Sequence, residues 1–194
     1  MEPMIDRARR GEYYTGDAEL SAKLDRAQTE VMRLNTIGGE DSERRHAELS
    51  AFLGGFGEGS IIRPPFYCDF GDGITIGDRT FINSTCTMLD VASITIGSEC
   101  DIACAVSIVT ATHPIDPVAR RADWELAKPI VIGDGVWIGA GVVVCPGVTI
   151  GENSVIGAGA VVTRDIPAGV VAYGNPARAM REIGEQDRLE LPGL

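Results

Sequence analysis

The sequence predicts a mainly β protein, with a parallel β-helix of six-residue repeats over residues from about 74 to about 174. Three observations support this: a six-residue aliphatic period, 24 glycines and only 6% aromatic residues. The aliphatic residues of the main run are Ile132, Ile138, Val144, Ile150, Ile156 and Val162. A period of six fits neither an amphipathic helix nor a hairpin, but it fits short strands joined by tight corners. No repeat buries its apolar face alone, so the coils must stack.

An earlier run of the same period precedes this one and contains one irregularity. Its aliphatic residues are Ile76, Ile82, Met88 and Ile94, after which the period slips by two and resumes at Ile96, Ile102 and Ile108. We expect both runs to form one β-helix domain over residues 59–174, in which most repeat positions are scaffold.

Residues 112–129 interrupt the repeat. The stretch after Thr112, HPIDPVARRADWELAK, is polar and contains prolines and charges of both signs. We expect a loop that protrudes from the coil, and long loops on rigid scaffolds commonly carry function. The alternative is an insertion that the fold tolerates without a role.

Both ends of the chain are expected to be helical. In residues 1–58, one amphipathic helix is indicated by the spacing of Leu20, Leu24, Ala27, Val31 and Leu34. Asp41 can cap a second helix, which Gly54-Gly55 ends. In residues 175–194, Asn175-Pro176 has the form of a cap and first turn, so we expect a short polar helix there.

Composition and charge exclude several classes of protein. The formal net charge of −11 disfavours binding to nucleic acid or to anionic membranes. No run of about eighteen apolar residues is present, so no membrane span is expected. The first residues, MEPMIDRARRGEYY, lack the apolar region of a secretory signal, which favours the cytoplasm. The five cysteines form no C-x-x-C pair and are interpreted as reduced.

Only two histidines are available for chemistry. His46 lies on the charged face of an expected helix and is interpreted as a solvated surface residue. His113 lies where the repeat breaks into the loop, so it is the candidate general base, the alternative being a loop histidine without a role. No Cys/His cluster has ligand spacing, so no metal site is expected. No motif of a catalytic nucleophile appears, so a covalent acyl-enzyme is not expected. This favours direct transfer of a group to an acceptor hydroxyl that one base activates.

Several strings resemble the maltose/galactoside O-acetyltransferase family, with the maltose and nodulation acetyltransferase branch most similar. The most specific are TATHPIDPVAR at residues 110–120 and EL-x-KP at residues 125–129. NSTCTMLDV, GVWIGAGVVVCPGVTIG, VVTRDIP, GNPAR and the leading MIDRARRGEYY also match. The resemblance implies a left-handed parallel β-helix and a homotrimer whose active sites are shared between neighbouring subunits. It also implies acetyl transfer from acetyl-CoA to a sugar hydroxyl.

The resemblance assigns roles on the acceptor side. His113 would remove the acceptor proton, and Glu125 would orient the imidazole or help to hold the substrate. Asn83 and Asp90 would bind acceptor hydroxyls, and Asp17 would be a further contact. An eighteen-residue coil from Asn83 to Asp101 would bring these groups near His113.

On the donor side, the family lays the pantetheine arm in a groove between coils. The matching positions are Trp137, Gly139, Ala140, Gly157, Ala158 and Thr163. Backbone N–H groups near Ala140 could stabilise the oxyanion. The phosphates would be bound by Arg164, Arg178 and Arg181, a local concentration of cations in an acidic chain, although Arg178 and Arg181 could instead be solvated helix charges.

The chain departs from the family's pattern at three positions, the first two in comparison with the galactoside branch. Asp90-Val91 replaces an acidic pair, Ala140 replaces a hydroxyl residue, and Phe81 replaces a tyrosine. The first departure favours the maltose-like branch, the second leaves cofactor contact there to backbone groups, and the third removes a hydroxyl from the acceptor pocket. The precise sugar is left open. Two alternatives remain: a hexapeptide acetyltransferase for a non-sugar acceptor such as serine or an antibiotic, and a non-catalytic β-helix scaffold.

Overall fold

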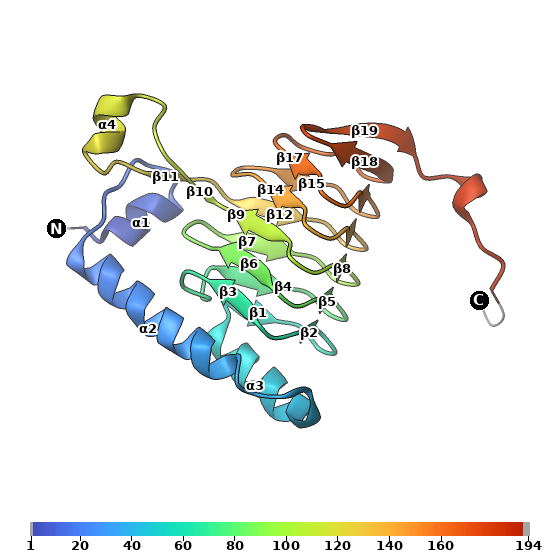
Figure 1. Ribbon diagram of the computed structural model, residues 1–194, viewed down its shortest axis with the longest axis horizontal. Coiled ribbons are helices and arrows are strands. Elements are labelled where there is room, and N and C mark those ends of the chain that lie inside the picture. Colours follow the sequence, from blue (N-terminus) through green and yellow to red (C-terminus); the bar gives the residue numbers. More distant parts are fainter. Residues whose placement is uncertain (1, 192–194) are drawn as a thin grey trace.

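The structure is a computed structural model that describes residues 2–191. Helices α1 (Met4–Arg9), α2 (Ala18–Leu34) and α3 (Ser42–Phe52) precede a prism of stacked β-strands (Figure 1). The predicted parallel β-helix is therefore confirmed. It begins slightly earlier than residue 59, because the strand at residues 55–56 already pairs with the next coil.

The prism has three sheets of parallel strands, and successive coils contribute strands to the three sheets in turn. The first sheet contains β1 (Gly55–Phe56), β4 (Ile74–Ile76), β7 (Ile94–Ile96), β12 (Ile130–Ile132) and β15 (Thr149–Ile150). The second contains β2 (Ile61–Ile62), β5 (Phe81–Ile82), β8 (Asp101–Ile102), β13 (Trp137–Ile138), β16 (Val155–Ile156) and β18 (Val170–Gly174). The third contains β3 (Phe66–Cys68), β6 (Cys86–Leu89), β9 (Ser107–Val109), β14 (Val143–Val144) and β17 (Val161–Val162).

The core consists of aliphatic ladders that run along the inside of the prism. Ile74, Ile94 and Ile130 pair in register on the first sheet, and each is 0% exposed. Burying one such side chain contributes about 1.5–3 kcal/mol, so a ladder of several is a major source of stability. Close stacking also explains a glycine, because a Cβ on Gly139 would lie 2.6 Å from the backbone nitrogen of Ala158.

Coil length changes along the stack, which explains the slip of two residues in the sequence. Ile61 pairs with Phe81 and Phe81 with Asp101, an offset of twenty residues, whereas Trp137 pairs with Val155, an offset of eighteen. The longer coils have enlarged corners between the third and first sheets. The expected eighteen-residue step from Asn83 to Asp101 is therefore wrong.

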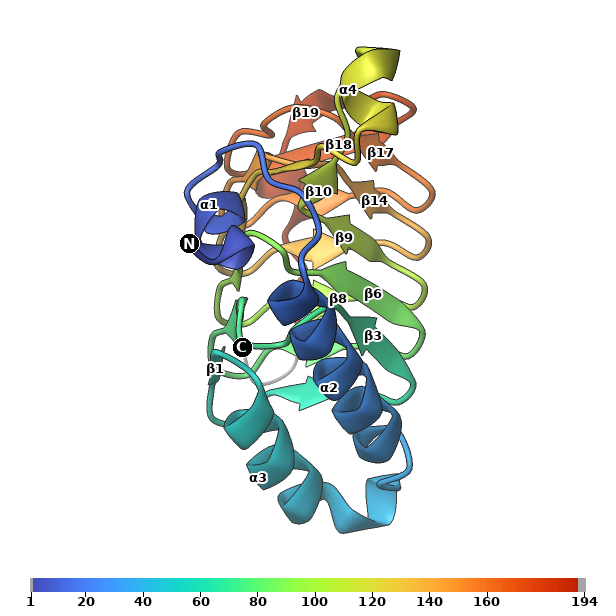
Figure 2. The same cartoon turned by 90° about the vertical axis from the view of Figure 1, so that its left-hand side faces the viewer.

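The segment over residues 112–129 leaves the coil between β9 and β12 as a hairpin. β10 (Ala111–Thr112) pairs antiparallel with β11 (Leu126–Ala127), and the short helix α4 (Pro117–Arg121) lies at its tip (Figure 2). The Asp116 side chain accepts a hydrogen bond from the Val118 N–H and so caps α4. The hairpin lies beside α1 and the residues that follow it.

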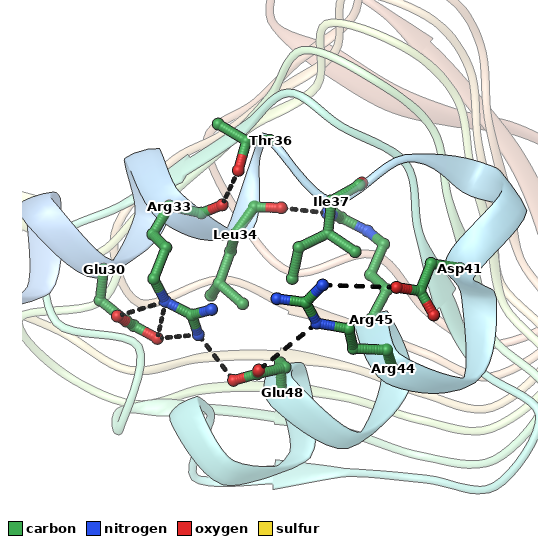
Figure 3. Close-up of polar contacts among 9 residues, drawn as sticks. All are labelled: Glu30, Arg33, Leu34, Thr36, Ile37, Asp41, Arg44, Arg45 and Glu48. Atoms are coloured by element: carbon green, nitrogen blue, oxygen red, sulfur yellow. Dashed lines mark hydrogen bonds and ion pairs between the residues drawn. The ribbon is translucent and has the colours of Figure 1, made fainter.

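Helix α3 covers the end of the prism where the first coils lie, and α2 runs along the side of the prism toward that end (Figures 1 and 2). Arg45 on α3 is 5% exposed and donates to the carbonyl oxygens of Leu34, Ile37 and Ile62, which ties the end of α2 to β2. Figure 3 shows its contact with Leu34. Asp41 precedes α3 as expected, but its side chain makes no cap. His46 is half-buried rather than solvated, and its Nε2 lies 3.1 Å from the Gly57 carbonyl oxygen.

The predicted C-terminal helix is wrong. After a cis Asn175-Pro176 bond, β19 (Ala177–Glu182) pairs antiparallel with β18, and only a 3-10 turn, η2 (Glu185–Asp187), follows. The physical reason is that the last coil leaves β18 with unpaired backbone groups, which β19 satisfies. The Asn-Pro signal is local and contains no information about the pairing that β18 requires.

Candidate functional site

A pocket, here called the corner pocket, lies at the edge where the third sheet turns into the first. Three successive corners of the coil and the N-terminal segment form it, with a volume of about 270 Å³, near the lower end for small-molecule sites. It is lined by Tyr14, Gly16, Leu20, Ser21, Leu24, Asp69, Phe70, Val91, Ala111 and Glu125.

Glu125 enters this pocket from the hairpin. Its Oε2 accepts a hydrogen bond of 2.7 Å from the hydroxyl of Tyr14, which is 2% exposed. His113 lies opposite Glu125 when the β10–β11 register, which pairs Thr112 with Leu126, is extended by one residue. Because strand residues alternate in direction, His113 and Glu125 belong to the same face of the hairpin as Ala111. His113 itself is exposed, at the end of the hairpin stem.

The corner pocket also contains a carboxylate that the sequence did not single out. Burial, followed by the negative charges of Asp90 and Glu125, raises the pKa of Asp69 to about 6. No ion pair of Asp69 or Glu125 is found within residues 2–191. The pocket is therefore acidic. The Lys23 Nζ lies 5.3 Å from the centroid of the Phe70 ring, but it is paired with Asp72.

Asp90 does not contact the pocket in the expected way. It is 0% exposed, and its carboxylate accepts hydrogen bonds from the backbone N–H groups of Asp69, Phe70 and Gly73. The prediction that Asp90 binds acceptor hydroxyls is therefore corrected: Asp90 holds an enlarged corner together.

Asp17 is also engaged elsewhere. It is the N-cap of α2, and its Oδ1 accepts a hydrogen bond of 2.7 Å from the Leu20 N–H. Its Oδ2 lies 3.4 Å from the backbone nitrogen of Met4. The side chain is half-buried, so capping is the role that the contacts support.

A second pocket, here called the strand-end pocket, lies on the second sheet and its corner. It is lined by Phe81, Asn83, Asp101, Ile102, Ala103 and Trp137. Trp137 is 55% exposed and stands in register with Asp101 and Phe81 on neighbouring coils. The Asn83 N–H donates to the Ile102 carbonyl oxygen, which places Asn83 over Ala103.

The corner that follows Trp137 contains the expected donor-side positions. Ala140 and Ala158 are exposed at stacked corners, where the Gly159 N–H donates to the Ala140 carbonyl oxygen. The Ala140 N–H makes no hydrogen bond within residues 2–191, so it can donate to a ligand. Gly139 and Gly157 serve the stacking, because a Cβ at Gly157 would lie 2.8 Å from the Cβ of Tyr173.

The three arginines differ in their surroundings. Arg164 is exposed and follows Thr163 at the same edge as the corner pocket, two coils further along. Arg178 is exposed on β19. Arg181 donates two hydrogen bonds of 2.7 Å to Asp187, and this pairing lowers the pKa of Asp187 to about 2. Arg181 is thus already neutralised, which weakens its assignment to a phosphate.

The expected site residues fall into two groups at different edges of the prism. His113, Glu125 and Thr163 lie where the third sheet turns into the first, whereas Asn83 and Ala140 lie where the second turns into the third. The expectation that the rungs bring Asn83 near His113 in one chain is therefore wrong.

Sequence reasoning missed Tyr14 and Asp69. Tyr14 lies 111 positions from Glu125, and no periodicity links them. Asp69 lies in an irregular corner before the clear repeats begin. Neither a metal-binding group of His, Cys, Asp and Glu nor a helix able to cross a membrane occurs within residues 2–191.

A parallel β-helix with these repeats defines a hexapeptide-repeat protein, and the family described as bacterial transferase hexapeptide (six repeats) matches residues 129–164. Nodulation protein L of Rhizobium meliloti (strain 1021) is 49% identical over 166 residues, which cover 86% of this chain and 91% of that protein.

Two solved structures are also similar along nearly the whole chain. A galactoside acetyltransferase in complex with coenzyme A matches with a TM-score of 0.91 and 38% identity, covering 96% of this chain and 94% of that one. A maltose O-acetyltransferase from Clostridium difficile 630 matches with a TM-score of 0.92 and 38% identity, covering 95% of this chain and 99% of that one. The chain belongs to the hexapeptide-repeat acetyltransferase family, which confirms the resemblance in its sequence.

Proposed function

We propose that the protein transfers the acetyl group of acetyl-CoA directly to a hydroxyl of a sugar, with His113 as the general base, and that it acts in the cytoplasm. The observation that supports this proposal is the β10–β11 hairpin. Its register, extended by one residue, pairs His113 with Glu125, which lines a pocket of about 270 Å³. The related proteins named as galactoside and maltose acetyltransferases support a sugar acceptor.

In this mechanism each residue has one task. His113 takes the proton of the acceptor hydroxyl while its oxygen attacks the thioester carbonyl carbon. The Ala140 N–H donates to the oxyanion of the tetrahedral intermediate. The carbon–sulfur bond then breaks, and His113 returns the proton to the departing thiolate. Arg164 and Arg178 are exposed cations suited to the phosphates of acetyl-CoA.

We further propose a homotrimer with active sites between neighbouring subunits. The corner pocket of one subunit would face the strand-end pocket and the Ala140 corner of the next. This arrangement is supported by the separation of the two groups within one chain, because neither edge alone offers both a base and a donor-side groove.

An acetyl-CoA consumption assay tests the function across a panel of mono- and disaccharides, with serine and an aminoglycoside included as non-sugar acceptors. We expect turnover with a sugar, and a loss of about 10²–10⁴-fold in the His113→Ala variant. Turnover only with a non-sugar acceptor would contradict the sugar assignment, and near-normal turnover of His113→Ala would remove His113 as the base.

A further inference from the structure

Tyr14 is joined to Glu125 by three hydrogen bonds, although the two residues lie in distant parts of the chain. The Tyr14 N–H donates to the Glu125 carbonyl oxygen at 3.0 Å, and the Glu125 N–H donates to the Tyr14 carbonyl oxygen at 2.8 Å. The Tyr14 hydroxyl donates to Glu125 Oε2 at 2.7 Å. The N-terminal segment therefore forms a third strand-like partner of the hairpin and fixes both the backbone and the carboxylate of Glu125.

The Tyr14 ring cannot easily move away from this contact. Its side chain is almost fully buried, and it packs in a small cluster with Ala8, Phe70, Val91, Ala92 and Ala127. Burial and the neighbouring Glu125 raise the pKa of Tyr14, so its hydroxyl stays protonated and remains a donor. A rigid donor of this kind selects one orientation of the carboxylate.

The other carboxylate oxygen of Glu125, Oε1, has no hydrogen bond within residues 2–191. Glu125 lines the corner pocket, and the extended hairpin register sets His113 opposite it. One oxygen is therefore held by Tyr14 while the other can accept from an acceptor hydroxyl or from the imidazole N–H. Such fixing matters because a misplacement of about 1 Å can cost about 10²-fold in rate.

We propose that Tyr14 is a positioning residue for acetyl transfer, whose hydroxyl fixes the Glu125 carboxylate in the corner pocket opposite His113. The inference rests on the proposed function and extends it to a residue of the N-terminal segment. It explains why that segment is hydrogen-bonded to the hairpin rather than only packed against it.

Four variants test the inference: Tyr14→Phe, Glu125→Ala, the double variant, and Tyr13→Phe as a matched control. Tyr14→Phe keeps the buried ring and removes only the hydroxyl, whereas Tyr13 is 51% exposed and makes no side-chain hydrogen bond within residues 2–191. The measurements are kcat and KM for the acceptor and for acetyl-CoA, with thermal unfolding to verify that each variant is folded.

We expect Tyr14→Phe to lower kcat/KM for the acceptor about tenfold, since a hydrogen bond to a charged group is lost. KM for acetyl-CoA should stay within about twofold, and Tyr13→Phe should resemble the wild type. In the Glu125→Ala background, Tyr14→Phe should add less than about twofold, because no carboxylate remains to be positioned.

Two results would overturn the inference about Tyr14 but leave the proposed function standing. One is an unchanged kcat/KM for the acceptor in Tyr14→Phe. The other is the same loss of kcat/KM on Tyr14→Phe with and without the Glu125 carboxylate. An equal loss in both backgrounds would mean that Tyr14 acts only through packing. A wild-type protein without turnover on any sugar would instead overturn the proposed function, and the inference with it.

Discussion

Asp69 is a carboxyl group of the corner pocket whose ionisation is affected by the fold. Its pKa rises to about 6 because burial and the charges of Asp90 and Glu125 disfavour the carboxylate. The folded protein therefore binds the Asp69 proton more tightly than the unfolded chain does. Stability is reduced as the pH rises from about 4 to above 6, where Asp69 is charged in both states.

Replacing Asp69 by Asn should remove this cost. We expect Asp69→Asn to raise the free energy of unfolding by about 2 kcal/mol at pH 7.5 and to change it much less at pH 4. Urea unfolding at both pH values measures the difference. The same gain at both values would show that ionisation of Asp69 is not the cause.

Among the elements, the enlarged corners depend on one buried side chain. Asp90 accepts from three backbone N–H groups, at 2.8 Å from Phe70, 3.0 Å from Gly73 and 3.1 Å from Asp69. We expect Asp90→Ala to lower the free energy of unfolding by about 2–4 kcal/mol, because buried donors are left without partners. Asp90→Asn, which keeps one acceptor oxygen, should cost less. A loss below about 0.5 kcal/mol in Asp90→Ala would contradict this role.

Some elements of the fold could be predicted from the sequence and others could not. The β-helix was predictable because each coil repeats the same inward aliphatic residues, and the slip of two marked the change in coil length. The structure after residue 175 was not predictable. Asn175-Pro176 is a local helix signal, whereas β19 forms because it pairs with the free edge of β18.

The candidate site was only partly predictable for the same reason. His113 could be found because the repeat breaks beside it, and Glu125 followed from the resemblance. Tyr14 could not, because its partner is set by how the N-terminal segment folds back on the hairpin. The burial of Asp90 likewise depends on how successive corners stack.

At the scale of the whole molecule, the separation of the two groups of site residues predicts complementation between inactive variants. If each site takes His113 from one subunit and Asn83 from the next, subunits of His113→Ala and Asn83→Ala can form intact sites when mixed. Random mixing of equal amounts gives intact pairing at about one site in four.

Unfolding the two variants together and refolding them should therefore restore up to about a quarter of wild-type turnover, while each variant refolded alone stays inactive. Sedimentation analysis of the refolded sample verifies the oligomer. No recovery from a correctly assembled mixture would mean that both residues act within one chain, and turnover by either variant alone would mean that its residue is not required.

The pairing of β19 with β18 affects how copies of this protein can stack on one another. A stack of parallel coils is a repeating lattice in one dimension, and any bare terminal coil is a template on which another chain could continue it. Here α3 covers one end, and β19 runs back in the opposite direction at the other (Figure 1). The reversal ends the parallel order of the second sheet, so a further parallel coil cannot pair with β18 there.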